Sequence, residues 1–276
     1  MSDEIKIGII GGSGLEDPAF IDDYSTTKVE TPYGDPSSDL IVGKICDVPV
    51  VIISRHGEGH TINPTNVNYR ANIWSLKEQG CSHLLATTAC GSLREEIKPG
   101  DFIFPDQFID RTTKRITTFY NDSTVQHVPM GTPFCAITSA VLQDQAGKLG
   151  LSFQPQGTVV TIEGPRFSSK AESMIFRSWG CDIINMSTVP EVVLARELGI
   201  CYQNIAMSTD YDCWHESEEE VSIELVFAVM AKNAETVKKL IKNTIPALSS
   251  EDCDCLLYTS DAADEGLGVD LGGRRI

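Results

Sequence analysis

Two carboxylates separated by one residue, Asp210 and Asp212, are the strongest candidates for acid–base chemistry in this sequence. They follow the segment Cys201–Met207, which is predicted to be a buried strand. If the chain stays extended as far as Asp212, both side chains lie on one face, because side chains alternate along a strand. Such a pair can accept hydrogen bonds from an exocyclic amine and protonate a ring nitrogen, provided that burial raises a pKa. A helix cap with a salt-bridge partner is the structural alternative.

Three loops that end predicted strands carry groups able to bind an anion. Gly11–Gly14 follows the apolar run Ile5–Ile10 and offers backbone amides and the Ser13 hydroxyl. It matches neither the dinucleotide fingerprint nor the P-loop, and a tight turn is its structural alternative. Arg55–Gly57 suits a dianion such as phosphate, and Thr87–Ser92 supplies small hydroxyl residues. Because open α/β sheets bind ligands at strand ends, these loops can converge on one anion.

Two further segments have the composition of a ligand pocket. Thr161–Phe167 places a carboxylate before Gly-Pro, followed by Arg166 and an aromatic residue. This pattern is typical of a pocket lip, on which Phe167 can stack against a flat base. The segment Asn185–Ser187 ends another predicted strand and offers an amide, a thioether and a hydroxyl to a ribose and a phosphate.

Alternating strands and helices must position these groups. The patterns predict a single α/β domain with a central mixed sheet flanked by helices on both faces. The predicted strands are Ile5–Ile10, Leu40–Ile45, Val48–Ser54, His83–Ala89, Phe102–Pro105, Gly157–Ile162, a strand from Asp182 to Asn185, and Cys201–Met207. The predicted helices are Tyr69–Glu78, Phe134–Leu149, Ser169–Trp179, Thr188–Leu198 and Ser222–Ile241, with Gly150 and Gly180 as helix stops.

Composition excludes several classes of function. The net charge of -17 argues against a nucleic-acid partner, although local Arg and His residues can still favour an anionic small molecule. The longest apolar stretches are too short to span a membrane, and the acidic N-terminus lacks the features of a signal peptide. Nine scattered cysteines are typical of a reducing, cytosolic location. Cys253 and Cys255 form a C-x-C pair without a second pair or a nearby His, so no metal site is predicted.

The character of the sequence changes near its end. Residues 1–250 are predicted to form the folded domain, and residues 251–276 a disordered or non-native tail. From Leu256 onward the chain lacks sustained periodicity and contains several glycines, so a translated library or vector sequence is one hypothesis. An ordinary disordered tail is the other, and neither carries function.

Taken together, these segments resemble the trimeric purine nucleoside phosphorylase family, and within it the 5'-methylthioadenosine phosphorylase branch. The resemblance extends from about Ile5 to Pro246 and rests on long strings rather than single motifs. These strings are Ile7–Gly12, Val67–Trp74, Thr87–Pro99, Val160–Ser169, Asn185–Val193 and Thr209–Trp214.

The resemblance implies a site and an assembly. It implies a homotrimer located in the cytoplasm, or also in the nucleus. The enzyme would act in purine and methionine salvage. It would need no cofactor, and inorganic phosphate would be a co-substrate. His127 would reach the methylthio pocket of a neighbouring subunit, beside that subunit's Ile223, Val226 and Phe227. The implied phosphate contacts are Ser13, Arg55, His56, Thr88, Ala89 and Ser187. The implied substrate contacts are Phe167, Asn185, Met186, Thr209, Asp210 and Asp212, the last two also being the catalytic candidates.

Specificity follows from the same residues. Two Asp and no Asn favour a 6-amino over a 6-oxo purine, and apolar groups suit a 5'-methylthio substituent. Ser13 and Ser187 stand where relatives often carry Thr, Phe227 is bulkier than expected, and the sequence after Ser250 does not match the family's closing helix. The expected reaction is reversible phosphorolysis of 5'-methylthioadenosine to adenine and 5-methylthioribose 1-phosphate. A phosphorylase for 6-oxopurine nucleosides or methylthioinosine, and a non-catalytic nucleoside-binding protein, are the alternatives.

Overall fold

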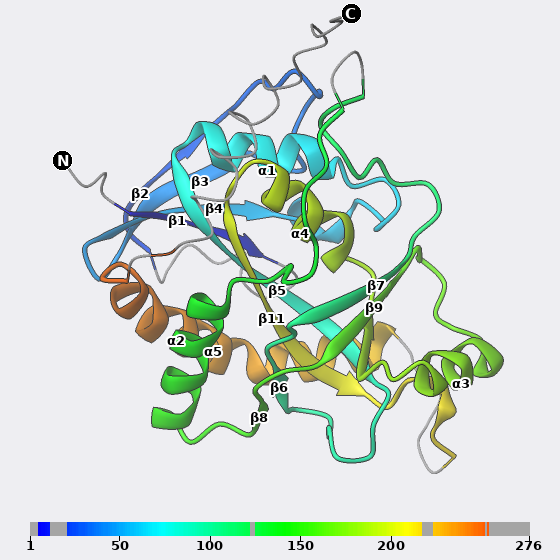
Figure 1. Cartoon of the computed structure of the whole chain (residues 1–276). Coiled ribbons are helices and arrows are strands. Elements are labelled where there is room, and N and C mark those ends of the chain that lie inside the picture. The colour runs from blue at the N-terminus through cyan, green and yellow to red at the C-terminus, as the bar shows by residue number, and fades with distance from the viewer. Residues whose placement is uncertain (1–4, 12–20, 122–124, 217–222, 252, 254–276) are drawn as a thin grey trace, which may run out of the picture.

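The computed structural model describes residues 5–11, 21–121, 125–216, 223–251 and 253. Its centre is a mixed sheet in which the described strands follow the order β2-β3-β4-β1-β5-β10-β9-β7, while β11 joins β5 to β6, and β6 pairs with β8 (Figure 1). The strands are β1 (Lys6–Gly11), β2 (Asp22–Thr27), β3 (Leu40–Ile45), β4 (Val48–Ser54), β5 (Cys81–Ser92), β6 (Phe102–Ile103), β7 (Gln107–Arg111), β8 (Phe153–Gln154), β9 (Thr158–Ile162), β10 (Ile183–Asn185) and β11 (Cys201–Asp210).

Helices cover both faces of this sheet. On one face α1 (Tyr69–Glu78) packs beside α4 (Thr188–Glu197), and on the other α2 (Ala136–Lys148) packs beside α5 (Ile223–Leu248) (Figure 1). The helix α3 (Lys170–Ser178) lies near the β7–β9 edge. No helix among the described residues is long and apolar enough to cross a membrane.

The sheet has a hydrophobic core on each of its two faces, which explains why the inner strands carry apolar residues at successive positions. In β1, Ile7 and Ile9 enter the core beneath α2 and α5, whereas Ile10 enters the core beneath α1 and α4. In β5, Leu84 and Leu85 divide in the same way. A strand covered on both faces needs apolar residues at successive positions, which is the observed pattern.

Local signals set several helix ends. Ser169 and Glu172 form a reciprocal capping box at the start of α3. Gly150 and Gly180 follow α2 and α3 with φ of 67° and 86°, a conformation that glycine adopts without steric cost. The predicted helix stops are therefore confirmed.

The predicted fold class is confirmed, and four elements differ from prediction. The strands β2, β7 and β8 were missed. The edge strand β2 reads Asp-Asp-Tyr-Ser-Thr-Thr and pairs only along one side with β3, and β8 is two residues long and pairs only with β6. The helix α5 continues past its predicted end, through Pro246 to Leu248. Because Ile245 and Leu248 are fully buried, their burial offsets the hydrogen bond that a proline cannot donate.

Candidate active site

The carboxyl ends of the parallel strands β4, β5 and β11 meet at one cavity of about 160 Å³. The loop after β10 completes it. Most of the residues that the sequence singles out lie around this cavity, although they come from distant parts of the chain. The predicted residues that line it are Arg55, His56, Thr88, Ala89, Phe167, Asn185, Met186, Ser187, Thr209, Asp210, Asp212 and Val226.

Arg55 follows β4 and is almost completely buried, at 1% exposure. Its Nε and Nη2 donate to the two carboxylate oxygens of Glu191 at 2.5 and 3.1 Å, and Nη1 donates to the Thr87 carbonyl at 2.8 Å. Burial opposes the charge, but Glu191 outweighs it and raises the pKa of Arg55 above its ordinary value. A guanidinium has five N–H groups, so two are left to bind an anion in the cavity.

His56 enters the cavity as a neutral ring. Its Nδ1 lies 2.9 Å from the Ile62 carbonyl, which can only accept, so Nδ1 carries the proton and Nε2 is a hydrogen-bond acceptor. Burial, assisted by the charge of Arg55, lowers the pKa of His56 to about 3. Nε2 is therefore suited to accept a hydrogen bond from a phosphate hydroxyl, and positive charge at this position comes from Arg55.

The hydroxyls of Thr88 and Ser187 lie 3.0 Å apart at the same cavity. Thr88 belongs to β5, whereas Ser187 precedes α4 without making a capping bond. Both hydroxyls can turn to donate to one anion, because a hydroxyl proton rotates freely. Ala89 lines the cavity next to them, and Ser13 lies outside the described residues.

The two carboxylates meet by a different geometry from the predicted extended one. The strand β11 ends at Asp210, and Asp212 opens a 3₁₀ turn with φ of 50°. The Asp212 backbone N–H donates to Asp210 Oδ1 at 2.7 Å, and the Thr209 hydroxyl donates to Asp210 Oδ2 at 2.7 Å. The prediction that both side chains share a strand face is therefore wrong, although both line the cavity.

Burial gives Asp210 the property that acid catalysis requires. It raises the pKa of Asp210 to about 6, and the charge of Asp212 adds to the increase, against the hydrogen bonds from Thr209 and the Asp212 amide. Burial also raises the pKa of Asp212. A carboxyl near pKa 6 can deliver a proton at neutral pH.

Gly91 on β5 allows this arrangement. A Cβ at this position would lie 3.0 Å from Asp210 Oδ1 and 3.2 Å from Asp212 Cβ. Any larger residue would therefore press on the side chains of both aspartates. The glycine is needed here for space rather than for its backbone conformation.

The cavity rim partly departs from the sequence-based interpretation. Phe167 is 37% exposed and lines the rim, as a stacking residue would. The Asn185 side chain instead accepts from the Thr161 hydroxyl at 3.1 Å and donates to the Thr188 hydroxyl at 2.7 Å. These bonds indicate that Asn185 chiefly holds its loop in place.

Only some of the apolar residues predicted for the methylthio pocket can be located. Val226 on α5 lines the cavity, while the side chains of Ile223 and Phe227 lie outside the described part of the chain. His127 is exposed and is not among the residues that line the cavity of its own chain.

Sequence reasoning missed several lining or supporting residues. Glu191 is 1% exposed and also accepts from the Tyr202 hydroxyl at 2.8 Å. A lone carboxylate inside the apolar stretch from Val189 to Ala195 was the available signal, because a buried charge requires a partner. The missed apolar residues that line the cavity are Pro64, Ile162, Ile184 and Met230.

Comparisons with a family model and with known proteins point to the same family. A family model described as "Phosphorylase superfamily" matches residues 6–246. The chain is 57% identical over 255 residues to S-methyl-5'-thioadenosine phosphorylase of Danio rerio, covering 91% of each chain. It is 56% identical over 261 residues to the protein of that name in Xenopus tropicalis, covering 92% of this chain and 93% of the other.

Solved structures agree in fold. Methylthioadenosine phosphorylase from Schistosoma mansoni in complex with adenine matches with a TM-score of 0.90 and 40% identity, covering 95% of this chain and 98% of the other. A mutant adenosine/methylthioadenosine phosphorylase from the same organism, in complex with methylthioadenosine, matches with a TM-score of 0.89 at 39% identity and the same coverage. Since the family model and these relatives span nearly the whole described domain, the chain belongs to the phosphorylase superfamily.

Proposed function

We propose that this chain catalyses the reversible phosphorolysis of 5'-methylthioadenosine to adenine and 5-methylthioribose 1-phosphate. One observation carries the proposal: a single cavity combines a buried carboxyl whose pKa is raised to about 6 with a buried guanidinium and two adjacent hydroxyls. The first group suits protonation of a leaving purine, and the others suit an attacking phosphate. The similarity to enzymes named for this substrate supports the same reaction.

The reaction breaks the bond between ribose C1' and purine N9. The electron pair of this bond passes to the base, whose N7 takes the proton of the Asp210 carboxyl, while C1' becomes cationic. A phosphate oxygen then forms the new bond to C1' with inversion. Arg55, with the hydroxyls of Thr88 and Ser187, would hold the phosphate beneath C1'. There the negative charge of the phosphate stabilises the cation. Fixed groups in a buried cavity lower the barrier because they need little rearrangement.

The carboxyl also explains a preference for adenine. A protonated Asp210 can donate to N7 with one oxygen and accept from the 6-amino group with the other. A 6-oxo group would place two acceptors against each other, which costs about 1–3 kcal/mol for an unpaired buried group. The alternative of a 6-oxopurine or methylthioinosine phosphorylase is therefore disfavoured. The intact anion-binding groups disfavour a non-catalytic binding protein.

Apolar side chains favour the methylthio substituent. Ile162, Ile184, Val226 and Met230 offer no hydrogen-bond partner to a 5'-hydroxyl. Inorganic phosphate acts as co-substrate in this scheme, and the proposed steps use no cofactor or metal.

Phosphate-dependent release of free base tests the proposed function. We expect release of adenine from methylthioadenosine only with phosphate. We expect kcat/KM for adenosine to be about 5- to 150-fold lower, because its hydroxyl would lose a partner. Methylthioinosine and inosine, assayed in parallel, are expected to react more slowly still. Preference for an inosine compound would contradict the carboxylate argument, and no release from any of the four would favour a binding protein.

We further propose a cytoplasmic homotrimer in which His127 completes the methylthio pocket of a neighbouring subunit. The exposure of His127, away from its own cavity, supports this role. His127→Ala is expected to raise KM for methylthioadenosine more than KM for phosphate, with the trimer preserved in light scattering. A monomeric active enzyme, or equal effects on both KM values, would argue against it.

A further inference from the structure

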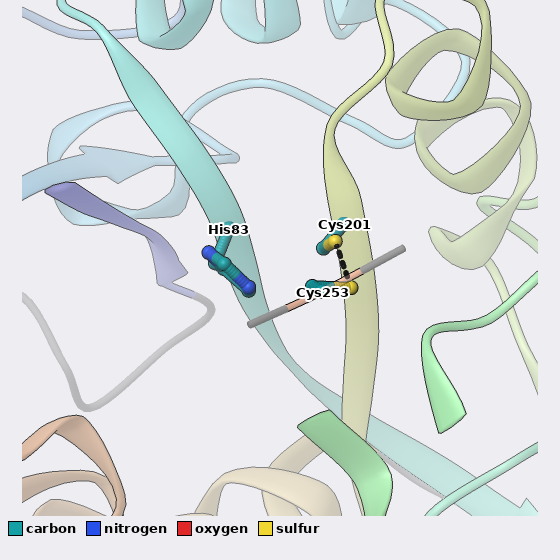
Figure 2. Close-up of side chains that lie close together, drawn as sticks. All are labelled: His83, Cys201 and Cys253. Carbon is teal, nitrogen blue, oxygen red and sulfur yellow. Dashed lines mark hydrogen bonds between the residues drawn. The ribbon is translucent and has the colours of Figure 1, made fainter. Parts of the chain in front are cut away.

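A second cluster of reactive side chains lies on the same two strands as the active site, toward their other end. His83 on β5 and Cys201 on β11 are register partners in a parallel pair, so their side chains project to the same face of the sheet. Cys253, just after α5, meets them there, and one ligand atom of each of the three lies within 4.8 Å of the others (Figure 2).

A third thiol joins this cluster. Cys135 precedes α2, and its Sγ lies 3.3 Å from Cys253 Sγ, while Cys201 Sγ lies 2.8 Å from the same sulfur. His83, Cys135 and Cys201 are each about 1% exposed, and Cys253 is half-buried. Three thiols and an imidazole are the donor set of a common closed zinc site.

His83 supplies the observation that points to a ligand. Its Nδ1 lies 2.9 Å from the Ser82 hydroxyl, whereas its Nε2 is buried without a hydrogen-bond partner among the described residues. An unpaired buried imidazole nitrogen is costly, and a metal ion would satisfy it. Ser82 would then hold the ring from its other nitrogen, as partners of metal-bound histidines commonly do.

We propose that His83, Cys135, Cys201 and Cys253 bind one zinc ion. Zinc–sulfur bonds of about 2.3 Å in a tetrahedron place sulfurs roughly 3.8 Å apart. The two observed separations, 2.8 and 3.3 Å, are shorter and share Cys253. A tetrahedral site therefore requires Cys253 to move away from both sulfurs. It also requires Cys135 to move toward the other ligands, because Cys135 does not belong to the group of three whose ligand atoms all lie within 4.8 Å of one another. Binding would release the protons of the three thiols, because thiolates are the ligands.

The site would be structural rather than catalytic. His83 lies five positions before Thr88 on β5, so the two are separated by roughly 16 Å along the strand. Zinc would therefore attach the segment after α5 to the sheet and to the start of α2. The sequence concealed the site, because its ligands come from four distant positions and only Cys253 belongs to the C-x-C pair, from which no metal site was predicted. The inference does not depend on the proposed reaction.

Metal analysis of the full chain tests the proposal. The protein, made without a polyhistidine tag and purified under a thiol reductant, is dialysed against zinc and then against zinc-free buffer. We expect about one bound zinc per chain in the wild type. In Cys201→Ser and Cys253→Ser we expect the zinc content to be at least about tenfold lower. Cys46→Ser, which removes an exposed cysteine, is the matched control and should keep its zinc.

Two further measurements separate metal from other roles. A cobalt-loaded protein should show thiolate-to-metal charge-transfer absorption that Cys253→Ser loses, and a chelator should lower Tm of the wild type but not of that variant. Phosphorolysis at moderate temperature should be unchanged in Cys253→Ser, so that failure of the proposed reaction is distinguishable. Retention of no zinc would overturn the proposal. So would a Cys201–Cys253 disulfide, seen as a loss of two hydrogens in the intact mass of protein purified without reductant.

Discussion

Replacement of Asp210 by Asn is expected to lower kcat/KM for methylthioadenosine by about 100- to 10,000-fold, the range typical of a lost general acid. The amide cannot deliver a proton to the leaving base. It can nevertheless keep the local structure, because its oxygen can accept from the Asp212 amide. Thr209 has a second acceptor in the Cys90 carbonyl, at 3.3 Å. The adenine dissociation constant, measured by calorimetry, should therefore change far less than turnover.

The pH profile gives this prediction a specific form. Because the pKa of Asp210 is about 6, the protonated fraction falls as pH rises above that value. Phosphate also titrates near neutrality, so the informative quantity is the ratio of kcat/KM for wild type to that for Asp210→Asn at each pH. This ratio is expected to decline from about pH 6 to pH 8. A constant ratio would show that Asp210 acts only through binding or structure.

The same substitution is expected to stabilise the protein. An Asp whose pKa rises on folding favours the folded state when protonated, so this contribution is lost as pH increases from about 4 through 6. The shift corresponds to a cost of about 3 kcal/mol at pH 7, which Asn does not incur. Chemical denaturation should show Asp210→Asn to be the more stable protein at pH 7 and nearly equal to wild type near pH 4. Equal stability at both pH values would mean that the carboxyl is not strained by burial.

Replacement of Glu191 by Gln is expected to cost about 3–5 kcal/mol of unfolding free energy. It leaves the Arg55 guanidinium buried without its opposing charge, and it weakens the hydrogen bond from Tyr202. Urea denaturation measures the loss. Asp144→Asn is the matched control, because it breaks a salt bridge between exposed Asp144 and Lys148, for which about 0.2–1 kcal/mol is expected.

A double variant separates the charge effect from packing. Arg55→Met together with Glu191→Gln removes both charges, and we expect it to be more stable than Glu191→Gln alone. It should remain inactive, because Arg55 is proposed to bind phosphate. Equal losses in Glu191→Gln and Asp144→Asn would instead indicate that the buried pair contributes little to folding.

The elements predicted well are those whose local pattern determines their structure. The run Val48–Ser54 is apolar up to Ile53 and becomes an interior strand, and α1 begins and ends at its predicted residues. The edge strand β2 lacks this pattern, because its side chains are mostly exposed and only pairing with β3 fixes it. Most residues that were singled out at predicted strand ends line the cavity, because ligands bind at strand ends in open sheets.

Other features of the site depend on contacts between distant residues. Nothing local to Glu191 shows that it meets Arg55, which is 136 positions away. The neutral state of His56 depends on its burial and on the position of the Ile62 carbonyl. The relation of Asp210 to Asp212 depends on a turn that interrupts the strand, made possible by the missing side chain of Gly91.

The position of β5 determines how activity is lost on heating. This strand is paired with β1, β10 and β11 and carries the cavity residues from Thr88 to Gly91. Amides in such a strand exchange with solvent only when the surrounding sheet opens, which is close to global unfolding. Partial openings at the molecular edges would therefore leave the β5 side of the cavity assembled. Heat inactivation should accordingly follow the exchange of β5 amides rather than the earlier exchange of edge strands such as β2.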